Sequence, residues 1–281
     1  MGIRLICLVL LALFSIALAA DDHLTSVRLA ERPTVNGEPT VIEVGLYVLD
    51  IEEIDDVSQR FSVDVFLVTH WQDPRLALPI AERTGKKRFF SLDEVWTPKV
   101  ICLNDRGLQP QLREGVEVDD LGNVKFQNRL MGELAANLEF KEFPFDVQLL
   151  PIDIVSYENT EDELQFALNS GFAAEADKFS IEGWSLKQLD PVLGVYVVPV
   201  DGAELPRLTY MIEATRDSDY YALTMLVPMS LIIFMAWTVF WLQPNIVPPR
   251  IAISTASIFS LIALGVSIRL GLPKISYLTK A

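Results

Sequence analysis

The sequence predicts a mainly β, extracellular sandwich, immunoglobulin-like and of about ten strands, followed by α-helical transmembrane segments. Three observations support this fold class. The chain begins with an apolar leader, the segment 21–219 is built of short alternating runs, and two long apolar stretches follow it. All 38 acidic residues lie at or before Asp219, so an acidic domain is joined to an apolar region without acids.

Residues 1–20 have the pattern of a signal peptide. The segment has a basic start at Arg4, an apolar run and the sequence Ala17-Leu18-Ala19, whose small residues at positions 17 and 19 are typical of a cleavage site. A first membrane anchor is the alternative, although the apolar run is short for a membrane span. Cys7 would leave with the signal peptide, so Cys102 is the single cysteine of the mature chain and cannot form an intrachain disulfide.

The segment 21–219 is predicted to be the β domain. In the run FSVDVFLVTHW, the residues Phe61, Val63, Val65 and Leu67 alternate with more polar ones, as in a half-buried strand. Similar runs recur along the segment, separated by Asn-Gly and Asp-Gly turn signals. Short strands at this spacing favour a sandwich of two sheets.

The first apolar stretch, residues 220–242, is predicted to be a transmembrane helix. It carries no charged residue, and about 22 residues at a rise of 1.5 Å cross the hydrocarbon core of a bilayer. Pro228 is tolerated there if neighbouring groups satisfy the freed carbonyl. The short loop 243–250 follows, and Arg250 in it agrees with a cytoplasmic position.

The second apolar stretch, residues 251–272, carries five hydroxyl side chains and Arg269. Polar residues in a span usually face a bundle interior or water, which favours a helix that lines a pore. Packing of small residues against another helix is the alternative, and the helical spacing is compatible with both. The face in question carries Ala252, Ala256, Phe259, Ala263, Val266 and Leu270. Residues 273–281 would then form a linker outside the membrane.

The sequence excludes several function classes. The acidic balance argues against nucleic acid as a partner. We find no phosphate-binding loop, nucleophile elbow or cluster of metal ligands, so we predict no catalytic residues, no metal site and no cofactor. The two histidines are His23 and His70, and His70 on a predicted strand is more readily explained as structural.

Five motifs occur in an order that resembles the pentameric ligand-gated ion channels, the Cys-loop receptor superfamily, and in particular its bacterial branch. They are WQDPRL (Trp71–Leu76), WTPKV (Trp96–Val100), FPFDVQ (Phe143–Gln148), Arg216 with the tyrosine pair 220–221 and Pro228, and LPKISY (Leu272–Tyr277). The resemblance covers most of the mature chain. It implies an extracellular or periplasmic sandwich and a multi-pass protein of the cell membrane.

The resemblance implies one subunit of a homopentameric ligand-gated channel, surrounded by membrane lipid. A small-molecule agonist or protons would bind the outer domain and shift the equilibrium toward an open pore. The second helix would line that pore, with Arg250 at the inner mouth and the face listed above. A membrane-anchored binding protein without conduction is the alternative function, and a tethered enzyme is a third.

The resemblance also implies roles for individual residues. Coupling of binding to gating would involve Phe143, Pro144, Phe145, Asp146, Arg216, Leu272, Pro273 and Lys274, with Asp146 paired to Arg216. An aromatic site between subunits would include Phe66, Tyr157 and Tyr196, while Leu103 replaces a usual aromatic residue.

The sequence departs from the family pattern in two respects. At the cysteine positions of the signature loop stand Ala136 and Leu150, so the family disulfide is absent. The family has four membrane helices and this chain has two, so we expect a fragment or a gene model cut short.

Rings of Arg250 and Arg269 favour anions as permeating ions, and Pro248-Pro249-Arg250 resembles the entry of the family's anion channels. The acidic outer domain would instead attract cations, which bacterial members often conduct.

Overall fold

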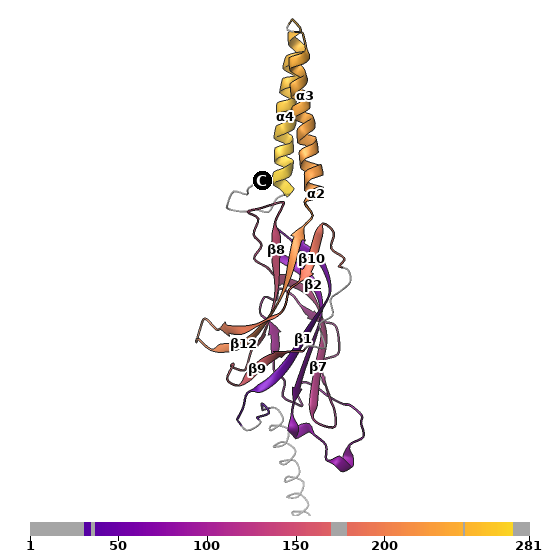
Figure 1. Ribbon diagram of the computed structural model, residues 1–281, viewed down its shortest axis with the longest axis vertical. Coiled ribbons are helices and arrows are strands. Elements are labelled where there is room, and N and C mark those ends of the chain that lie inside the picture. Colours follow the sequence, from indigo (N-terminus) through magenta and orange to yellow (C-terminus); the bar gives the residue numbers. More distant parts are fainter. Residues whose placement is uncertain (1–30, 35–36, 170–178, 244, 272–281) are drawn as a thin grey trace, which may run out of the picture.

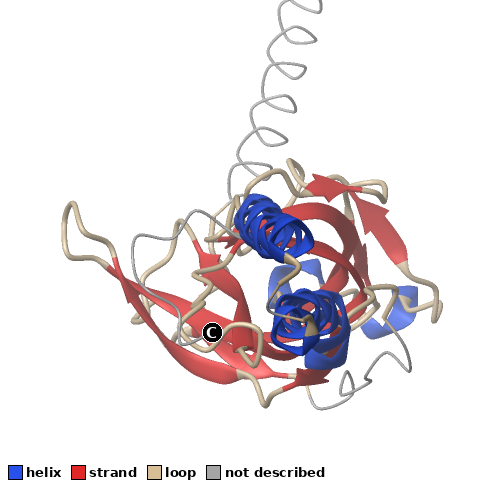
Figure 2. Cartoon of the chain, turned by 90° about the horizontal axis from the view of Figure 1, so that it is seen from above, coloured by secondary structure: helices blue, strands red, loops and turns tan. Residues whose placement is uncertain are grey.

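Two β-sheets packed face to face form the larger part of the chain, and a hairpin of helices extends from one end (Figure 1). The computed structural model describes residues 31–34, 37–169, 179–243 and 245–271. The predicted signal peptide 1–20 and linker 273–281 lie outside the described residues. Seen along the long axis, the helices lie over the sandwich (Figure 2).

The first sheet has seven strands in the order β3-β6-β7-β2-β1-β9, with β5 added beside β7. Its strands are β1 (Thr40–Asp55), β2 (Arg60–Gln72), β3 (Arg88–Phe90), β5 (Gln109–Pro110), β6 (Val116–Val118), β7 (Asn123–Ala135) and β9 (Leu164–Leu168). The pair β1–β2 and the pair β2–β7 are antiparallel, whereas β9 pairs with β1 in parallel.

The second sheet has five strands in the order β10-β12-β8-β4, with β11 beside β12. Its strands are β4 (Val100–Cys102), β8 (Val147–Ser156), β10 (Trp184–Gln188), β11 (Val192–Val197) and β12 (Glu204–Arg216). β12 pairs with three strands of this sheet and ends directly before the helices. It is therefore the strand that connects the sandwich to the helical hairpin.

The core lies between the two sheets, as the alternating pattern requires. Phe61, Val63, Val65 and Leu67 of β2 are at most 4% exposed. They belong to one hydrophobic core together with buried residues of the second sheet such as Ile152, which is 0% exposed. The described chain contains twelve strands, two more than expected. The additional strands are short, and two or three residues are too few to show an alternating pattern.

Two of the recognised motifs meet in this core. Trp71 of WQDPRL packs edge-to-face against Trp96 of WTPKV, with ring centroids 6.0 Å apart. Asp73 caps the short helix η1 (Pro74–Leu76) and binds the guanidinium of Arg75 at 2.7 Å. A second short helix, η2 (Ile80–Glu82), follows. The motifs therefore stabilise the end of the sandwich that lies away from the helices.

The first predicted span is interrupted near its start. It consists of α2 (Ser218–Tyr221), a π-helical turn η4 (Ala222–Leu226), α3 (Val227–Thr238) and a short helix η5 (Val239–Trp241). Pro228 follows the π-helical turn and lies in the first turn of α3. A proline has no amide proton for the preceding turn, and a wider turn accommodates its ring.

The second helix, α4 (Val247–Gly271), begins earlier than predicted. Arg250 thus lies in its first turn rather than in the loop 243–250, and the span does not start at Ile251. The reason is that Pro248 and Pro249 are compatible with a first helical turn, where their missing amide protons would have no partner.

Both helices have the length and composition of membrane spans. The segments are Leu223–Trp241 and Val247–Ile268, each with a mean hydropathy of 2.1. Only 6% of each segment is buried within the chain. Apolar surface of this extent requires a cover of lipid or of other protein, so the hairpin is compatible with a membrane location.

Candidate functional site

A buried arginine lies at the junction between the sandwich and the helices. Arg216 is the last residue of β12 and is 6% exposed. Its Nε donates to Oδ1 of Asp146 at 2.9 Å, and its Nη2 donates to Oδ2 at 3.2 Å. Asp146 is 2% exposed and directly precedes β8. The expected pair of Asp146 and Arg216 is therefore present, in a fork geometry that suits a guanidinium and a carboxylate.

A second carboxylate, which the sequence analysis missed, completes this cluster. Asp56, in the turn between β1 and β2, accepts from Nη2 of Arg216 at 3.0 Å. Gln148 donates to the carboxylate of Asp146 and also binds both backbone groups of Glu139. The turn after β1, the loop before β8 and the end of β12 are thereby joined by hydrogen bonds.

Two aromatic rings enclose the same guanidinium. The Cζ atom of Arg216 lies 4.1 Å from the ring centroid of Trp184 and 5.1 Å from that of Phe143. Such cation–π contacts are strongest where water is excluded. Trp184 begins β10 and pairs with Arg216 in the sheet, so the strand register places its ring. The sequence analysis missed Trp184, because only the register of β10 against β12 shows the contact.

Burial and hydrogen bonds within this cluster shift the pKa values of Asp56 and Arg216. Burial raises the pKa of Asp56, and the hydrogen bond from Arg216 only partly opposes this effect. For Arg216, burial alone would lower the pKa, but hydrogen bonds to Asp146 and Asp56 raise it above its ordinary value. Arg216 is therefore charged at all physiological pH values, whereas the raised pKa of Asp56 favours the protonated form of that carboxyl group.

The two phenylalanines beside Pro144 point to different environments. Phe143 is 4% exposed and belongs to the core, whereas Phe145 is 70% exposed. Pro144 between them is half-buried. Leu272, Pro273 and Lys274, which the sequence analysis assigned to coupling together with these residues, lie outside the described residues. Phe145 is thus the ring of the motif that is available for a further contact.

The four predicted agonist residues are divided between the two sheets. Leu103, Tyr157 and Tyr196 belong to the five-stranded sheet or to its connecting segments, while Phe66 lies on β2 of the other sheet. The Leu103 amide donates to the carbonyl of Asp153 in β8, and Tyr157 directly follows that strand. Tyr157 is 65% exposed and Leu103 36% exposed. The chain alone does not gather the four residues into one aromatic box.

Phe66 has charged neighbours that the sequence analysis missed. In the sheet register it lies between Tyr47 of β1 and Arg129 of β7. Arg129 binds the carboxylate of Asp64, a residue that is 5% exposed. The face around Phe66 therefore combines an aromatic ring with an ion pair.

The predicted pore face of α4 points away from the first span. Ser257 is the one buried side chain among the described residues of α4, and its hydroxyl donates to the carbonyl of Ile253 at 2.9 Å. α3 and η5 pack along α4, and the half-buried Ser254 and Ser260 flank Ser257 at helical spacing. Three of the five hydroxyls thus lie on the side toward α3, whereas Thr255 and Ser267 are exposed.

Apart from Arg250, which lies two turns before Ser257 and on the same side of the helix, the described pore-facing residues lie on the opposite side of α4. Phe259 is 66% exposed and Val266 51% exposed. The remaining described members of the face, Ala252, Ala256 and Ala263, are exposed as well, and Arg250 is half-buried. The side chain of Leu270 lies outside the described part of the structure. A face that no described element covers is available to other copies, to lipid or to water.

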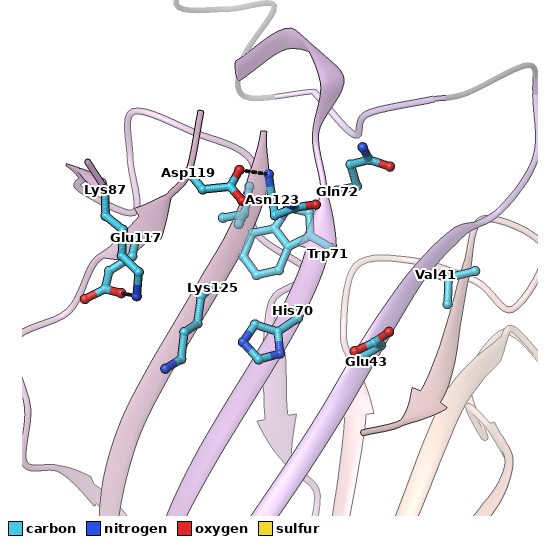
Figure 3. A pocket seen from close by; sticks show the side chains of 11 residues that line it. Val41, Glu43, His70, Trp71, Gln72, Lys87, Glu117, Asp119, Asn123 and Lys125 are labelled. Carbon is cyan, nitrogen blue, oxygen red and sulfur yellow. Dashed lines mark hydrogen bonds and ion pairs between the residues drawn. The ribbon is translucent and has the colours of Figure 1, made fainter. Parts of the chain in front are cut away.

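A polar hollow of about 530 Å³ lies on the seven-stranded sheet near its end away from the helices (Figure 3). His70 on β2 lies between Glu43 of β1 and Lys125 of β7, with the three side chains on one face. Its Nδ1 lies 2.9 Å from Nδ2 of Asn169. Burial lowers the pKa of His70, Lys125 lowers it further, and Glu43 opposes the effect. His70 therefore has hydrogen-bonding and electrostatic partners that explain it as a structural residue.

Comparison with known proteins identifies the family. Residues 19–204 match the neurotransmitter-gated ion-channel ligand-binding domain. This chain belongs to that family. It is therefore a member of the Cys-loop superfamily of ligand-gated channels, and the resemblance drawn from the five motifs is confirmed.

The curated relatives of this ligand-gated channel chain are themselves channel proteins. It is 23% identical over 247 residues to a proton-gated ion channel of Gloeobacter violaceus, covering 88% of this chain and 68% of that protein. It is also 23% identical over 256 residues to the mouse gamma-aminobutyric acid receptor subunit gamma-3, covering 88% of this chain and 54% of the subunit. A gamma-aminobutyric acid receptor subunit beta of Caenorhabditis elegans matches over 273 residues at 23% identity, covering 92% of this chain and 48% of that subunit. The chain spans about half the length of the receptor subunits that it matches.

Proposed function

We propose that this chain is a subunit of a ligand-gated ion channel that assembles as a homopentamer in the cell membrane. The family match carries the proposal, and the two apolar helices after the sandwich support it. The relatives are channels rather than enzymes, and the described residues contain no group of three or more possible metal ligands. The work of the protein is thus a shift between closed and open states, without covalent chemistry.

The pore is formed by α4 from each of five subunits. The support is that Phe259, Val266 and the three alanines of the same face are exposed and lie on the side away from α3. In a ring of subunits, the first span can face lipid while this exposed face of α4 surrounds the axis. Phe259 is the largest residue of that face, so five rings at this level form an apolar constriction that closes by dewetting.

The agonist binds between neighbouring subunits. The division of the four predicted residues between two sheets supports this arrangement, because the sheet with Tyr157 and the sheet with Phe66 present opposite sides of one subunit. In the assembled ring, the Phe66 side of one subunit would lie next to the Tyr157 side of its neighbour. A small molecule or a proton that binds this contact better in the open state opens the pore, and only that difference in affinity does so.

The cluster around Arg216 couples the outer domain to the helices. Arg216 ends β12, and α2 begins two residues later at Ser218. Asp56 and Asp146 attach the turn after β1 and the loop before β8 to the same guanidinium. A movement of the sandwich is therefore transmitted to the start of the first span at this point.

Anions are the proposed permeating ions. Arg250 lies in the first turn of α4, so five copies form a basic ring at the inner mouth, and the region after Asp219 contains no acid. The acidic outer domain has the opposite effect and attracts cations. Because salt screens exposed charges beyond about 8 Å, the ring inside the pore dominates over the charges of the outer domain.

Recording currents from the full-length gene product in a planar bilayer tests this function. Opening by an applied amine, amino acid or drop in pH is expected, with a reversal potential near that of chloride in asymmetric sodium chloride. A reversal potential near that of sodium contradicts the anion assignment but not the channel. A pure, properly inserted protein without any current under these conditions favours the membrane-anchored binding protein.

A further inference from the structure

A cavity of about 420 Å³ opens between the two sheets of a single subunit. One wall is formed by Leu67 and Thr69 of β2, which pair in the sheet with Asn128 and Phe126 of β7. The opposite wall is the segment 97–101, which includes the start of β4. The cavity therefore lies on the core side of the seven-stranded sheet, at the edge where β4 is the last strand of the other sheet.

One polar atom in this wall lacks a partner. Thr69 is 0% exposed, and its hydroxyl makes no hydrogen bond to any described residue. A buried hydroxyl without a partner lowers the stability of the fold, so such groups are rare unless something else satisfies them. Thr69 lines the cavity, which places the unsatisfied hydroxyl next to space that a ligand can fill.

The size and the remaining lining favour a small organic molecule over water. A volume of about 420 Å³ falls in the range of about 300–1,000 Å³ typical of small-molecule sites, whereas one water takes about 30 Å³. Apolar side chains dominate the walls, among them Leu92, Val100, Phe126 and Leu130. Water in such surroundings forms few hydrogen bonds, and an apolar group displaces it with a gain in affinity.

The rim of the cavity is joined to the predicted agonist region. Tyr157 and Glu158 line its opening, together with Lys99. The Tyr157 amide donates to the carbonyl of Lys99 at 3.1 Å, and Lys99 has a φ of 45°. A residue other than glycine rarely adopts this left-handed conformation, so the segment before β4 is held in an unusual geometry beside Tyr157.

We propose that this cavity is a ligand site within each subunit for a small, mainly apolar molecule with one hydrogen-bonding group, which binds the hydroxyl of Thr69. The site lies within one subunit, whereas the agonist is proposed to bind between subunits, and Tyr157 is common to both. Because Tyr157 belongs to its rim, an occupant alters the position of that residue and acts as a modulator of the agonist.

The binding test uses two probes that differ in one group. The probes are 4-(trifluoromethyl)benzyl alcohol and 4-(trifluoromethyl)toluene, and ¹⁹F NMR line broadening measures their affinity for the purified full-length protein in lipid nanodiscs. We expect the alcohol to bind more tightly by about fivefold, which corresponds to one net hydrogen bond. Equal affinity of the two probes would overturn the proposal.

Substitution at Thr69 separates a ligand site from a site for water. Thr69→Val keeps the shape of the side chain and removes the hydroxyl. We expect the alcohol to lose its advantage, the toluene to bind unchanged, and the melting temperature to rise. A lower melting temperature together with unchanged binding of the alcohol would show that ordered water satisfies Thr69 and would refute the site. Thr215→Val, at an exposed position of β12, is the matched control.

Filling the cavity controls for partition of the probes into lipid. Leu130→Trp is expected to abolish the saturable component of binding by both probes. If that variant does not fold, Leu92→Trp fills the cavity from a loop that tolerates change better. Saturable binding that persists in a folded, filled variant would place the probes elsewhere and would overturn the assignment.

Discussion

Arg216 is the residue on which the junction depends, because it is a buried cation between two carboxylates. We predict that Asp146→Asn lowers the free energy of unfolding by roughly 3–5 kcal/mol, since it leaves a buried charge without its main partner. Asp56→Asn should cost much less, because the side chain of Asp56 is 20% exposed and that of Asp146 2% exposed. Thermal unfolding of the purified protein compares the two variants, and equal losses would contradict the assignment of Asp146 as the main partner.

Asp56 gives the junction a dependence on pH. Its pKa is raised from 3.8 by burial, so the folded state binds a proton more tightly than the unfolded chain does. The contribution of Asp56 to stability is then greatest below that value and is lost as the pH rises through the raised pKa.

Asp56→Asn removes this dependence and provides the test. We predict that the variant gains stability relative to the wild type as the pH rises from about 4 to about 7. Melting temperatures at a series of pH values measure the difference. A difference that is constant over this range would show that the pKa of Asp56 is not raised.

The two phenylalanines of FPFD permit a matched comparison. Phe143→Ala should destabilise the protein by about 3–5 kcal/mol, because it opens a cavity in the core. Phe145→Ala should change stability by only about 0.5 kcal/mol, because that ring is 70% exposed. If Phe145 transmits movement to the helices, this variant loses agonist-evoked current at normal surface expression. Normal current from Phe145→Ala would remove the residue from the coupling path.

At the residue scale, the sequence could predict a contact between distant segments only where the family resemblance implied it. The pairing of Asp146 with Arg216, which are 70 residues apart, was expected on that ground. Asp56 lies 160 residues from Arg216 in the chain, and Trp184 reaches it only through the register of β10. Neither contact has a local signal, because it depends on where the strands end in the folded domain.

At the element scale, one side of α4 packs toward α3 and the opposite side is exposed. We predict that Phe259→Ser raises the resting conductance or the agonist sensitivity, because a polar ring at this level no longer excludes water from the constriction. Single-channel recording without agonist measures the effect. Ile258→Ser is the control, since Ile258 is exposed but lies beside the predicted face rather than on it. An equal effect of both substitutions would contradict the assigned face.

The spans show why some elements were predicted and others were not. Length and apolar composition are sufficient for two membrane helices, and the structure contains both. The π-helical turn before Pro228 and the early start of α4 at Val247 depend on local hydrogen bonding around prolines, which apolar length does not report. Likewise β5 is only two residues long and is defined as a strand by its pairing with β7, which the local sequence does not indicate.

At the scale of the whole molecule, the exposed hairpin requires partners, and the proposed ring of five copies would supply them. We predict that Ala256→Cys gives oxidative cross-links in ladders up to five subunits, because this face of α4 surrounds the axis in the proposed ring. Ser257→Cys should give none, because position 257 is buried toward α3. Burial raises the pKa of Cys102 to about 12, so its protonated thiol does not compete. Ladders from both variants, or from neither, would contradict the arrangement.

The whole-molecule architecture was largely accessible from sequence, whereas the assembly was not. Alternation, the apolar stretches and the confinement of acids before Tyr220 together indicated a sandwich joined to helices. The proposed contact between Phe66 and Tyr157 could not be derived in the same way, because the two residues belong to different sheets of one subunit. That contact would require a surface between copies, which one chain does not contain.

Strand β12 has a mechanical consequence. It runs without interruption from Leu205, which pairs with Tyr196, to Arg216 at the start of the helices. An extended strand of 13 residues is about 43 Å long at about 3.3 Å per residue, and its backbone is close to the greatest length that bond geometry allows. Tension applied at the Tyr196 end therefore cannot lengthen it. The length of backbone between that end and the first span stays fixed, so a displacement at the Tyr196 end reaches the first span as a translation, a rotation or a bend of the strand.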